Sequence, residues 1–273
     1  MKEQNRNLAL RVASAAVLAP LAIYATWHGG LFFAGLCAAA AALAAAELVA
    51  MFVPLRLPEA YGILVAALVP FAPWYAGGQY PPWTPVALAF AAMGLLALHV
   101  FTSEVADMAR RASAVALAWI YVAPVVASVV SLRLRFGTGW VILAFAAAFL
   151  NDTSAYFAGR FLGRHKLLER ISPKKTWEGA AGGVLGSVLG ALAVRLLDVT
   201  HDLGTLSLAG AAAIGLGAAV LGPVGDLAES MLKRSAGVKD SGRLIPGHGG
   251  LLDRIDALLF VAPWVWVYAA FLR

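Results

Sequence analysis

The sequence predicts an all-α, polytopic integral membrane protein with about nine transmembrane helices. Of its 273 residues, 61% are hydrophobic and only 13% are charged, whereas a soluble domain has about 25% charged residues. Apolar runs also recur at the roughly 17–25 residues that a helix needs to cross a bilayer. The net charge of +6 is explained by Lys and Arg in cytoplasmic loops facing anionic lipid, so no nucleic-acid partner is expected.

The apolar runs place the spans along the chain. They lie at about residues 12–28, 31–53, 60–76, 84–101, 113–132, 139–159, 178–197, 205–229 and 252–272. Pro70 and Pro73 are expected to kink the third span. The first span resembles a signal peptide, but no clear cleavage site follows it, so an uncleaved helix is expected.

The distribution of cations predicts the topology. With a cytoplasmic N-terminus, most of the 21 Lys and Arg residues fall on the inner side. The exceptions are Arg133, Arg135, Arg195 and Arg273. This asymmetry predicts an N-in, C-out, multi-pass protein of a bacterial-type inner (plasma) membrane. It places the polar loops around 160–177 and 230–251 on the cytoplasmic face.

We expect a single membrane domain with two parts. Residues 1–140 show only membrane-packing features and are assigned to packing and lipid access, and residues 141–273 carry the catalytic helices and cytoplasmic loops. Four glycines recur at small-xxx-small spacing in the seventh span, at positions 182, 183, 186 and 190. Such spacing serves either a homodimer interface or packing within the chain.

The most polar stretch of the chain is residues 230–256. Asp253 and Asp256 share a helix face at a spacing of three, and Asp226 and Glu229 repeat this spacing at the end of the preceding span. Acids in a first helical turn can be simple caps. Two such pairs at one depth would repel each other without a cation, which favours a Mg²⁺ site.

Glycines and cations surround these acids. Gly247, Gly249 and Gly250 precede the last span, where backbone amides can approach an anion, although a plain turn is the alternative. His248, between them, is either a general base or a hydrogen-bonding loop residue. Lys174 and Lys175 form a second basic cluster, which suits phosphate binding or, alternatively, contact with anionic lipid.

Two acids lie within apolar spans and remain unassigned. Glu47 interrupts an otherwise apolar helix, and Asp152 lies near the inner end of the sixth span. Such residues are expensive in lipid and are usually paired or functional.

The stretch from Ser230 to Asp256 resembles the signature of the phosphatidate cytidylyltransferases, also called CDP-diacylglycerol synthases. The matching positions are Ser230, Lys233, Arg234, Lys239, Asp240, Gly242, Ile245, Pro246, Gly247, His248, Gly249, Gly250, Leu251, Asp253, Arg254, Ile255 and Asp256. Gly225-Asp226, the stretch from Asp152 to Tyr156, and residues 172–179 are also similar to this family. The resemblance covers the C-terminal part of the chain, whereas residues 1–140 share only the hydropathy.

The resemblance implies an enzyme of phospholipid biosynthesis that joins CTP to phosphatidic acid in the membrane, with Mg²⁺ as cofactor. It implies that Asp226, Asp253 and Asp256 hold the metal. By the same resemblance the phosphate-binding region contains Ser230, Lys233, Arg234, Lys239 and Arg254, with Lys174, Lys175 and the glycine loop facing it.

Alternative functions are a CTP-dependent polyprenol or lipid kinase and a transporter of a phosphorylated anion. A kinase would transfer the γ-phosphate of CTP rather than CMP. A transporter would place its polar groups near the bilayer midplane, whereas the polar stretches here fall at one predicted face. The Asp-Gly and Ala-Arg pattern of CDP-alcohol phosphotransferases is absent from the sequence.

Overall fold

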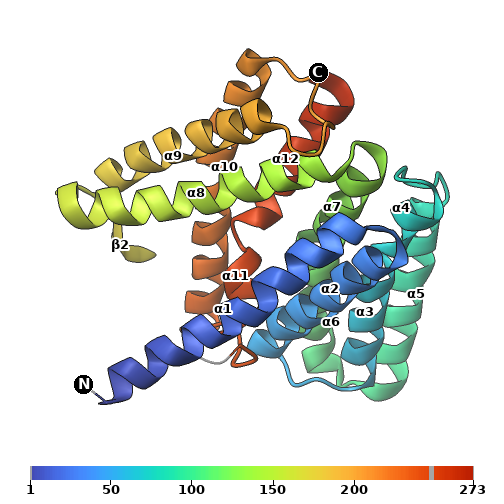
Figure 1. Cartoon of the computed structure of the whole chain (residues 1–273). Coiled ribbons are helices and arrows are strands. Elements are labelled where there is room, and N and C mark those ends of the chain that lie inside the picture. The colour runs from blue at the N-terminus through green and yellow to red at the C-terminus, as the bar shows by residue number, and fades with distance from the viewer. Residues whose placement is uncertain (1, 246–248, 273) are drawn as a thin grey trace. The chain divides into compact units, whose positions relative to one another are not determined.

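The computed structural model describes residues 2–245 and 249–272 and is almost entirely helical (Figure 1). The chain forms two compact units, Met1–Leu134 with Asp240–Arg254, and Arg135–Lys239 with Ile255–Arg273. The boundary near residue 134 resembles the expected division at residue 140. The segment Asp240–Arg254, however, belongs with the N-terminal helices, so most of the signature loop is in the first unit.

The first unit is a bundle around one alanine-rich helix. Its helices are α1 (Lys2–His28), α2 (Gly30–Phe52), α3 (Leu57–Leu68), α4 (Phe71–Tyr75), α5 (Thr84–Thr102), α6 (Val105–Tyr121) and α7 (Ala123–Arg135). Helix α2 contacts α1, α3, α4 and α6 (Figure 1). Ala41, Ala44 and Leu48 on α2 are fully buried, because small side chains let neighbouring helices approach closely.

The second unit is built on a helical hairpin. Its elements are α8 (Thr138–Leu162), β1 (Lys166–Leu168), β2 (Ser172–Thr176), α9 (Trp177–Leu197), α10 (Leu208–Ser235), and, after α11 (Leu252–Ile255), α12 (Leu258–Val267) with a π-helical turn at Tyr268–Leu272. Helices α8 and α9 run side by side (Figure 1). A Cβ on Gly182 would lie 2.3 Å from the Cβ of Ala158, and one on Gly186 would lie 2.5 Å from the Leu150 carbonyl oxygen. The small-residue face therefore packs within the chain.

A short β-hairpin departs from the all-α expectation. Strands β1 and β2 pair antiparallel, with Lys166 opposite Thr176 and Leu168 opposite Ser172. The side chain of Thr176 then caps α9 by accepting a hydrogen bond from the Gly179 amide (3.1 Å). The hairpin fixes β2 at the start of α9, so the basic segment expected to be a loop is ordered.

The helices match the nine predicted spans in position, but not all of them in length. Among the described residues, seven helical segments are long and apolar enough to cross a membrane. The first and last predicted spans correspond to shorter apolar helices, Ala16–His28 and Leu258–Leu272. Large apolar side chains such as Phe101 and Ile120 are exposed at 85% and 74%, as expected for a surface in contact with lipid. The chain is a multi-pass membrane protein, and its N-in, C-out orientation remains a prediction.

Candidate active site

Three of the predicted site residues lie on one face of helix α10 in the second unit. Asp226, Ser230 and Lys233 follow one another at helical spacings on this face. Asp226 Oδ1 accepts a hydrogen bond from Ser230 Oγ (3.3 Å). Asp226 Oδ2 forms an ion pair with Lys175 Nζ at 2.7 Å. Asp226 is thus held by one neighbour on its own helix and by a cation from strand β2.

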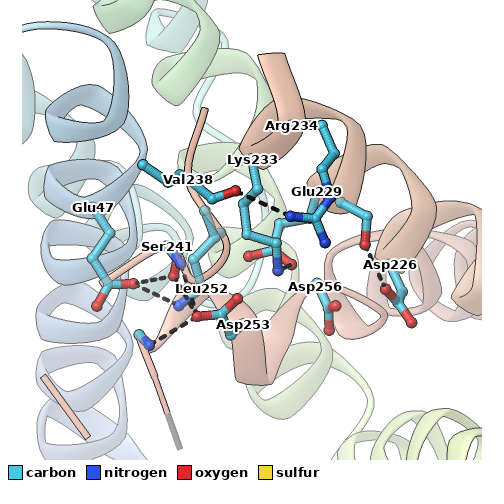
Figure 2. A network of polar contacts seen from close by, with 12 residues as sticks. Glu47, Asp226, Glu229, Lys233, Arg234, Val238, Ser241, Leu252, Asp253 and Asp256 are labelled. Carbon is cyan, nitrogen blue, oxygen red and sulfur yellow. Dashed lines mark hydrogen bonds and ion pairs between the residues drawn. The ribbon is translucent and has the colours of Figure 1, made fainter. Parts of the chain in front are cut away.

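Asp256 lies beside Asp226 in the same unit (Figure 2). It precedes α12, and α10 approaches it closely at Gly225, where a Cβ would come within 2.5 Å of the Asp256 carbonyl oxygen. Burial, followed by the negative charge of Asp226, raises the pKa of Asp256 above its usual range. The charge of Asp152 acts in the same direction, and Lys233 opposes it. Two carboxylates placed in this way favour a cation between them.

Lys233 and Glu229 form a buried pair on α10. Lys233 Nζ lies 2.6 Å from Glu229 Oε2, with side-chain exposures of 11% and 0%. The sequence suggested that Glu229 pairs with Asp226 as a second metal-facing acid. The structure instead balances Glu229 with Lys233, so part of the charge of Lys233 is neutralised within the protein.

The two lysines of strand β2 differ in their surroundings. Lys175 is half-buried and reaches Asp226, and it also donates to the Pro223 carbonyl on α10 (3.4 Å). Lys174 is exposed. The β-hairpin therefore directs only Lys175 into the carboxylate cluster. Alternating side chains on a strand point to opposite faces, which explains this difference.

Asp253, in the first unit, braces the signature loop, which we define as residues 240–252. Its Oδ2 accepts hydrogen bonds from the Ser241 amide (2.9 Å), the Ser241 hydroxyl (3.0 Å) and the Gly250 amide (2.9 Å). Asp253 thus holds both ends of the loop together. The Gly250 amide, expected to face a phosphate, donates to a carboxylate of the protein.

Glu47 is the residue whose role the sequence did not reveal. From α2 it accepts hydrogen bonds from the Leu252 amide (2.8 Å) and the Ser241 hydroxyl (3.0 Å) (Figure 2). It also accepts one from the Leu251 amide (2.9 Å). The available signal was an acid within an apolar helix, which usually has a partner or a function. Its partners are backbone amides about 200 residues away, and sequence patterns do not reveal such partners.

The remaining predicted site residues occupy different environments. Gly247 and His248 lie outside the described residues, while Gly249 has a φ of +84°, which favours glycine. Lys239 and Arg254 are exposed. The Arg234 guanidinium donates to the Val238 carbonyl (3.3 Å) at the end of α10.

The three predicted metal ligands are divided between the units. Asp226 and Asp256 are neighbours in the second unit, and Asp253 belongs to the first. Within residues 2–245 and 249–272, no three His, Cys, Asp or Glu side chains form a group able to hold a metal ion. The Asp226–Asp256 pair nevertheless fits Mg²⁺, which takes a few carboxylates and completes its shell with water and phosphate oxygens. Metal binding by all three aspartates remains a prediction.

The fold is that of a multi-pass membrane protein, and its second unit brings the carboxylates of Asp226 and Asp256 together with the cation of Lys175. A sequence profile of the Cytidylyltransferase family matches residues 9–272. The chain therefore belongs to the cytidylyltransferase family.

Similar proteins extend this assignment. A phosphatidate cytidylyltransferase of Thermotoga maritima is 32% identical over 262 residues, covering 94% of both chains. Its counterpart in Brucella abortus is 44% identical over 135 residues, covering 50% of this chain and 48% of the relative. The Synechocystis enzyme of the same name is 48% identical over 141 residues, covering 50% of this chain and 46% of the relative.

Proposed function

We propose that this protein is a phosphatidate cytidylyltransferase, which transfers CMP from CTP to phosphatidic acid. The products are CDP-diacylglycerol, a precursor in phospholipid biosynthesis, and pyrophosphate. The observation that carries the proposal is the Asp226–Asp256 carboxylate pair with Lys175 bound to it, in a chain of this family. Family membership supplies the reaction type, and the site supplies groups that suit it.

The reaction needs no covalent intermediate on the enzyme. A phosphate oxygen of phosphatidic acid attacks the α-phosphorus of CTP and forms a new P–O bond. The bond from the α-phosphorus to the bridging oxygen breaks on the opposite side, and pyrophosphate leaves with that electron pair. Positioning and charge stabilisation supply most of the rate in such transfers.

The protein's cations stabilise the charge that develops on the phosphates. Lys175 is held at the site by Asp226, where its ammonium can interact with a triphosphate. Lys174, Lys239 and Arg254 are exposed and are available to a nucleotide arriving from water. Preorganised cations of this kind act most strongly where water is excluded.

Magnesium is the cofactor that this site suits. Asp226 and Asp256 would hold the ion. Asp253, three residues before Asp256 along the chain, is the third ligand that the family resemblance predicts. When bound, Mg²⁺ would neutralise phosphate charge and orient the triphosphate. Asp253 has a second task in bracing the signature loop, so its replacement tests more than metal binding.

A site at the inner face of the membrane suits both substrates. Phosphatidic acid resides in the bilayer and reaches a membrane-embedded enzyme laterally, while CTP comes from the cytosol. The predicted N-in topology puts the polar loops on that side. Membrane lipid is thus both solvent and source of substrate.

Labelled CTP tests the reaction in detergent-solubilised protein. With phosphatidic acid and Mg²⁺, label on the α-phosphate is expected in the lipid product, and label on the γ-phosphate in released pyrophosphate. γ-Label in the lipid would identify a lipid kinase instead. Absence of any CTP-dependent lipid product would contradict the proposal and leave a transporter as the alternative.

The Asp256→Asn variant tests the site. Asparagine keeps the side-chain shape and the oxygen that accepts from the Ala257 amide (2.8 Å), but it lacks the negative charge. We expect turnover to fall at least about 100-fold, the scale of losing one preorganised electrostatic contact. Gel filtration and the thermal unfolding midpoint should match the unmodified protein. Unchanged turnover would refute the assigned role of Asp256.

A further inference from the structure

We propose that Glu47 is a positioning residue for the transfer reaction, anchoring the signature loop from the N-terminal helices. This inference rests on the proposed function, because it assigns Glu47 a part in that reaction. The hydrogen-bond partners of Glu47 lie in the signature loop. Its effect passes through the loop and through Asp253.

Both carboxylate oxygens of Glu47 accept hydrogen bonds from the signature loop. Oε1 accepts from the Leu251 amide, and Oε2 accepts from the Leu252 amide and the Ser241 hydroxyl. Leu252, at the start of α11, is fully buried. One carboxylate thus satisfies two backbone amides that would otherwise lack partners at a helix start. Its third contact holds the opposite end of the loop.

Two glycines of the loop, at positions 242 and 250, lie against the carboxylate of Glu47. A Cβ on Gly242 would lie 2.7 Å from Glu47 Oε1, and a Cβ on Gly250 would lie 2.4 Å from Oε2. Both distances are shorter than any normal contact, so neither position accepts a larger residue without movement. The lack of a side chain at these two glycines leaves room for the carboxylate of Glu47.

The Ser241 hydroxyl links the two anchors of the loop. It lies 3.0 Å from both Glu47 Oε2 and Asp253 Oδ2, and its single proton can be donated to only one of them at a time. The Ser241 amide donates to Asp253 in either case. Moving Glu47 would therefore disturb Ser241 and, through it, the carboxylate of Asp253.

The consequence for catalysis follows from the chain direction. Residues 240–252 lead directly into Asp253, Arg254 and Asp256, which the proposed reaction uses. A loop that loses its anchor on α2 would let Asp253 sample other orientations. Small errors in position are costly when the rate depends on alignment of reacting groups. The binding of the nucleotide should suffer before that of the lipid, because the loop carries the polar groups.

The Glu47→Gln variant tests the inference. Glutamine has the same shape, but its NH₂ group would face the Leu251 or the Leu252 amide, donor against donor. We expect kcat/KM for CTP to fall about 10–100-fold, as for other residues that orient a catalytic group. The KM for phosphatidic acid should stay within about twofold, a split that general loss of folded protein would not produce. Glu104→Gln is the matched control, since Glu104 is an exposed acid of the same unit, and its kinetics should be unchanged.

Hydrogen exchange provides a readout that is independent of activity. Peptides covering residues 240–255 should exchange faster in Glu47→Gln than in the unmodified protein, while those from α5 should not change. Ser241→Ala, which leaves both backbone bonds of Glu47 in place, should show a smaller shift in the same direction and remains informative if Glu47→Gln folds poorly.

The outcomes separate this inference from the proposed function. Wild-type kinetics and exchange in Glu47→Gln would overturn the role of Glu47 while the enzyme still makes CDP-diacylglycerol. Equal loss with both substrates, without faster exchange of the loop, would also overturn it. Failure of the unmodified protein to use α-labelled CTP would instead contradict the proposed function.

Discussion

At the scale of single residues, the site is a balance of charges rather than a set of free ligands. Asp226 is paired with Lys175, and Glu229 with Lys233. Asp256 is buried beside Asp226, and burial together with that negative charge raises its pKa. A triphosphate with its metal would enter a site whose own charges are already in place, and such preorganisation favours charge stabilisation during reaction.

The contrast between Lys175 and Lys174 leads to a prediction. Lys175→Met removes the cation that pairs with Asp226, and we expect kcat/KM for CTP to fall about 100-fold. Lys174→Met removes the same charge from an exposed position on the same strand and should cost less than about tenfold. Steady-state kinetics at fixed Mg²⁺ concentration would check this. Equal losses in the two variants would show that the pair with Asp226 has no special role.

The residues that the sequence predicted best are those close together in the chain. The choice of Asp253 and Asp256 as site residues rested on their spacing and on the family signature. The expectation that they share the face of one helix was wrong, because α11 ends at Ile255 and Asp256 lies in the turn before α12. The role of Glu47 did not follow, because its partners are about 200 residues away along the chain and two of the three are backbone amides. The partner of Glu229 was also missed, although Lys233 is one helical turn away. Asp226, three residues before Glu229, and Lys233, four residues after it, both lie on its helix face, so spacing alone did not show which of them Glu229 contacts.

At the scale of elements, the first unit contains a buried ion pair between neighbouring helices. Arg111 on α6 lies 2.6 Å from Glu59 on α3, with side-chain exposures of 2% and 0%. The adjacent Arg110 pairs with Asp107 at 3.0 Å, but these side chains are 60% and 45% exposed. Two consecutive arginines thus form one buried and one exposed pair.

This arrangement predicts very different costs for two similar substitutions. Glu59→Gln leaves the Arg111 charge buried without its partner and should lower the free energy of unfolding by about 3–5 kcal/mol. Asp107→Asn should lower it by about 0–1 kcal/mol. Unfolding by SDS titration in mixed micelles measures both. A small effect of Glu59→Gln would mean that Arg111 finds other acceptors, beyond the Pro54 carbonyl that it already contacts (3.2 Å).

The elements themselves were predictable to different extents. Long apolar helices follow from hydropathy, because lipid requires every backbone group to be paired within the segment. The β1–β2 hairpin was not predicted. Its strands are short and largely exposed, and Pro173 lies within β2, a residue that argues against a strand. The hairpin depends on the packing of β2 beside α8 and α9, which sequence patterns do not show.

At the scale of the whole molecule, the predicted N-in, C-out topology is testable with introduced cysteines. The chain has one cysteine, Cys37, which is buried, so background labelling should be low. Glu169→Cys, in the hairpin turn, should react with a membrane-impermeant maleimide only from the cytoplasmic side. Val199→Cys, between α9 and α10, should react only from the opposite side. Labelling of both positions from the same side would refute the topology.

The organisation into units was the least predictable feature. The sequence was divided near residue 140, where the polar clusters and the family resemblance begin, whereas the structure separates two units near residue 134 and again around residues 240–254. No local pattern shows that residues 240–254 belong with the N-terminal helices, since this follows from contacts such as those of Glu47. The number of membrane spans was also difficult to predict. Among the described residues, the first and last apolar helices are shorter than the seven long ones.

The attachment of the signature loop to Glu47 has a consequence for how the protein matures during translation. Helix α2 leaves the ribosome well before Leu251 and Leu252, which lie about 200 residues further along the chain. In the nascent chain, Glu47 therefore lies within an apolar helix without these partners until residues 251 and 252 have been made. The contacts of Glu47 form only once residues 241–252 have been made, so under the proposed function a chain stalled before them would be inserted in the bilayer yet inert.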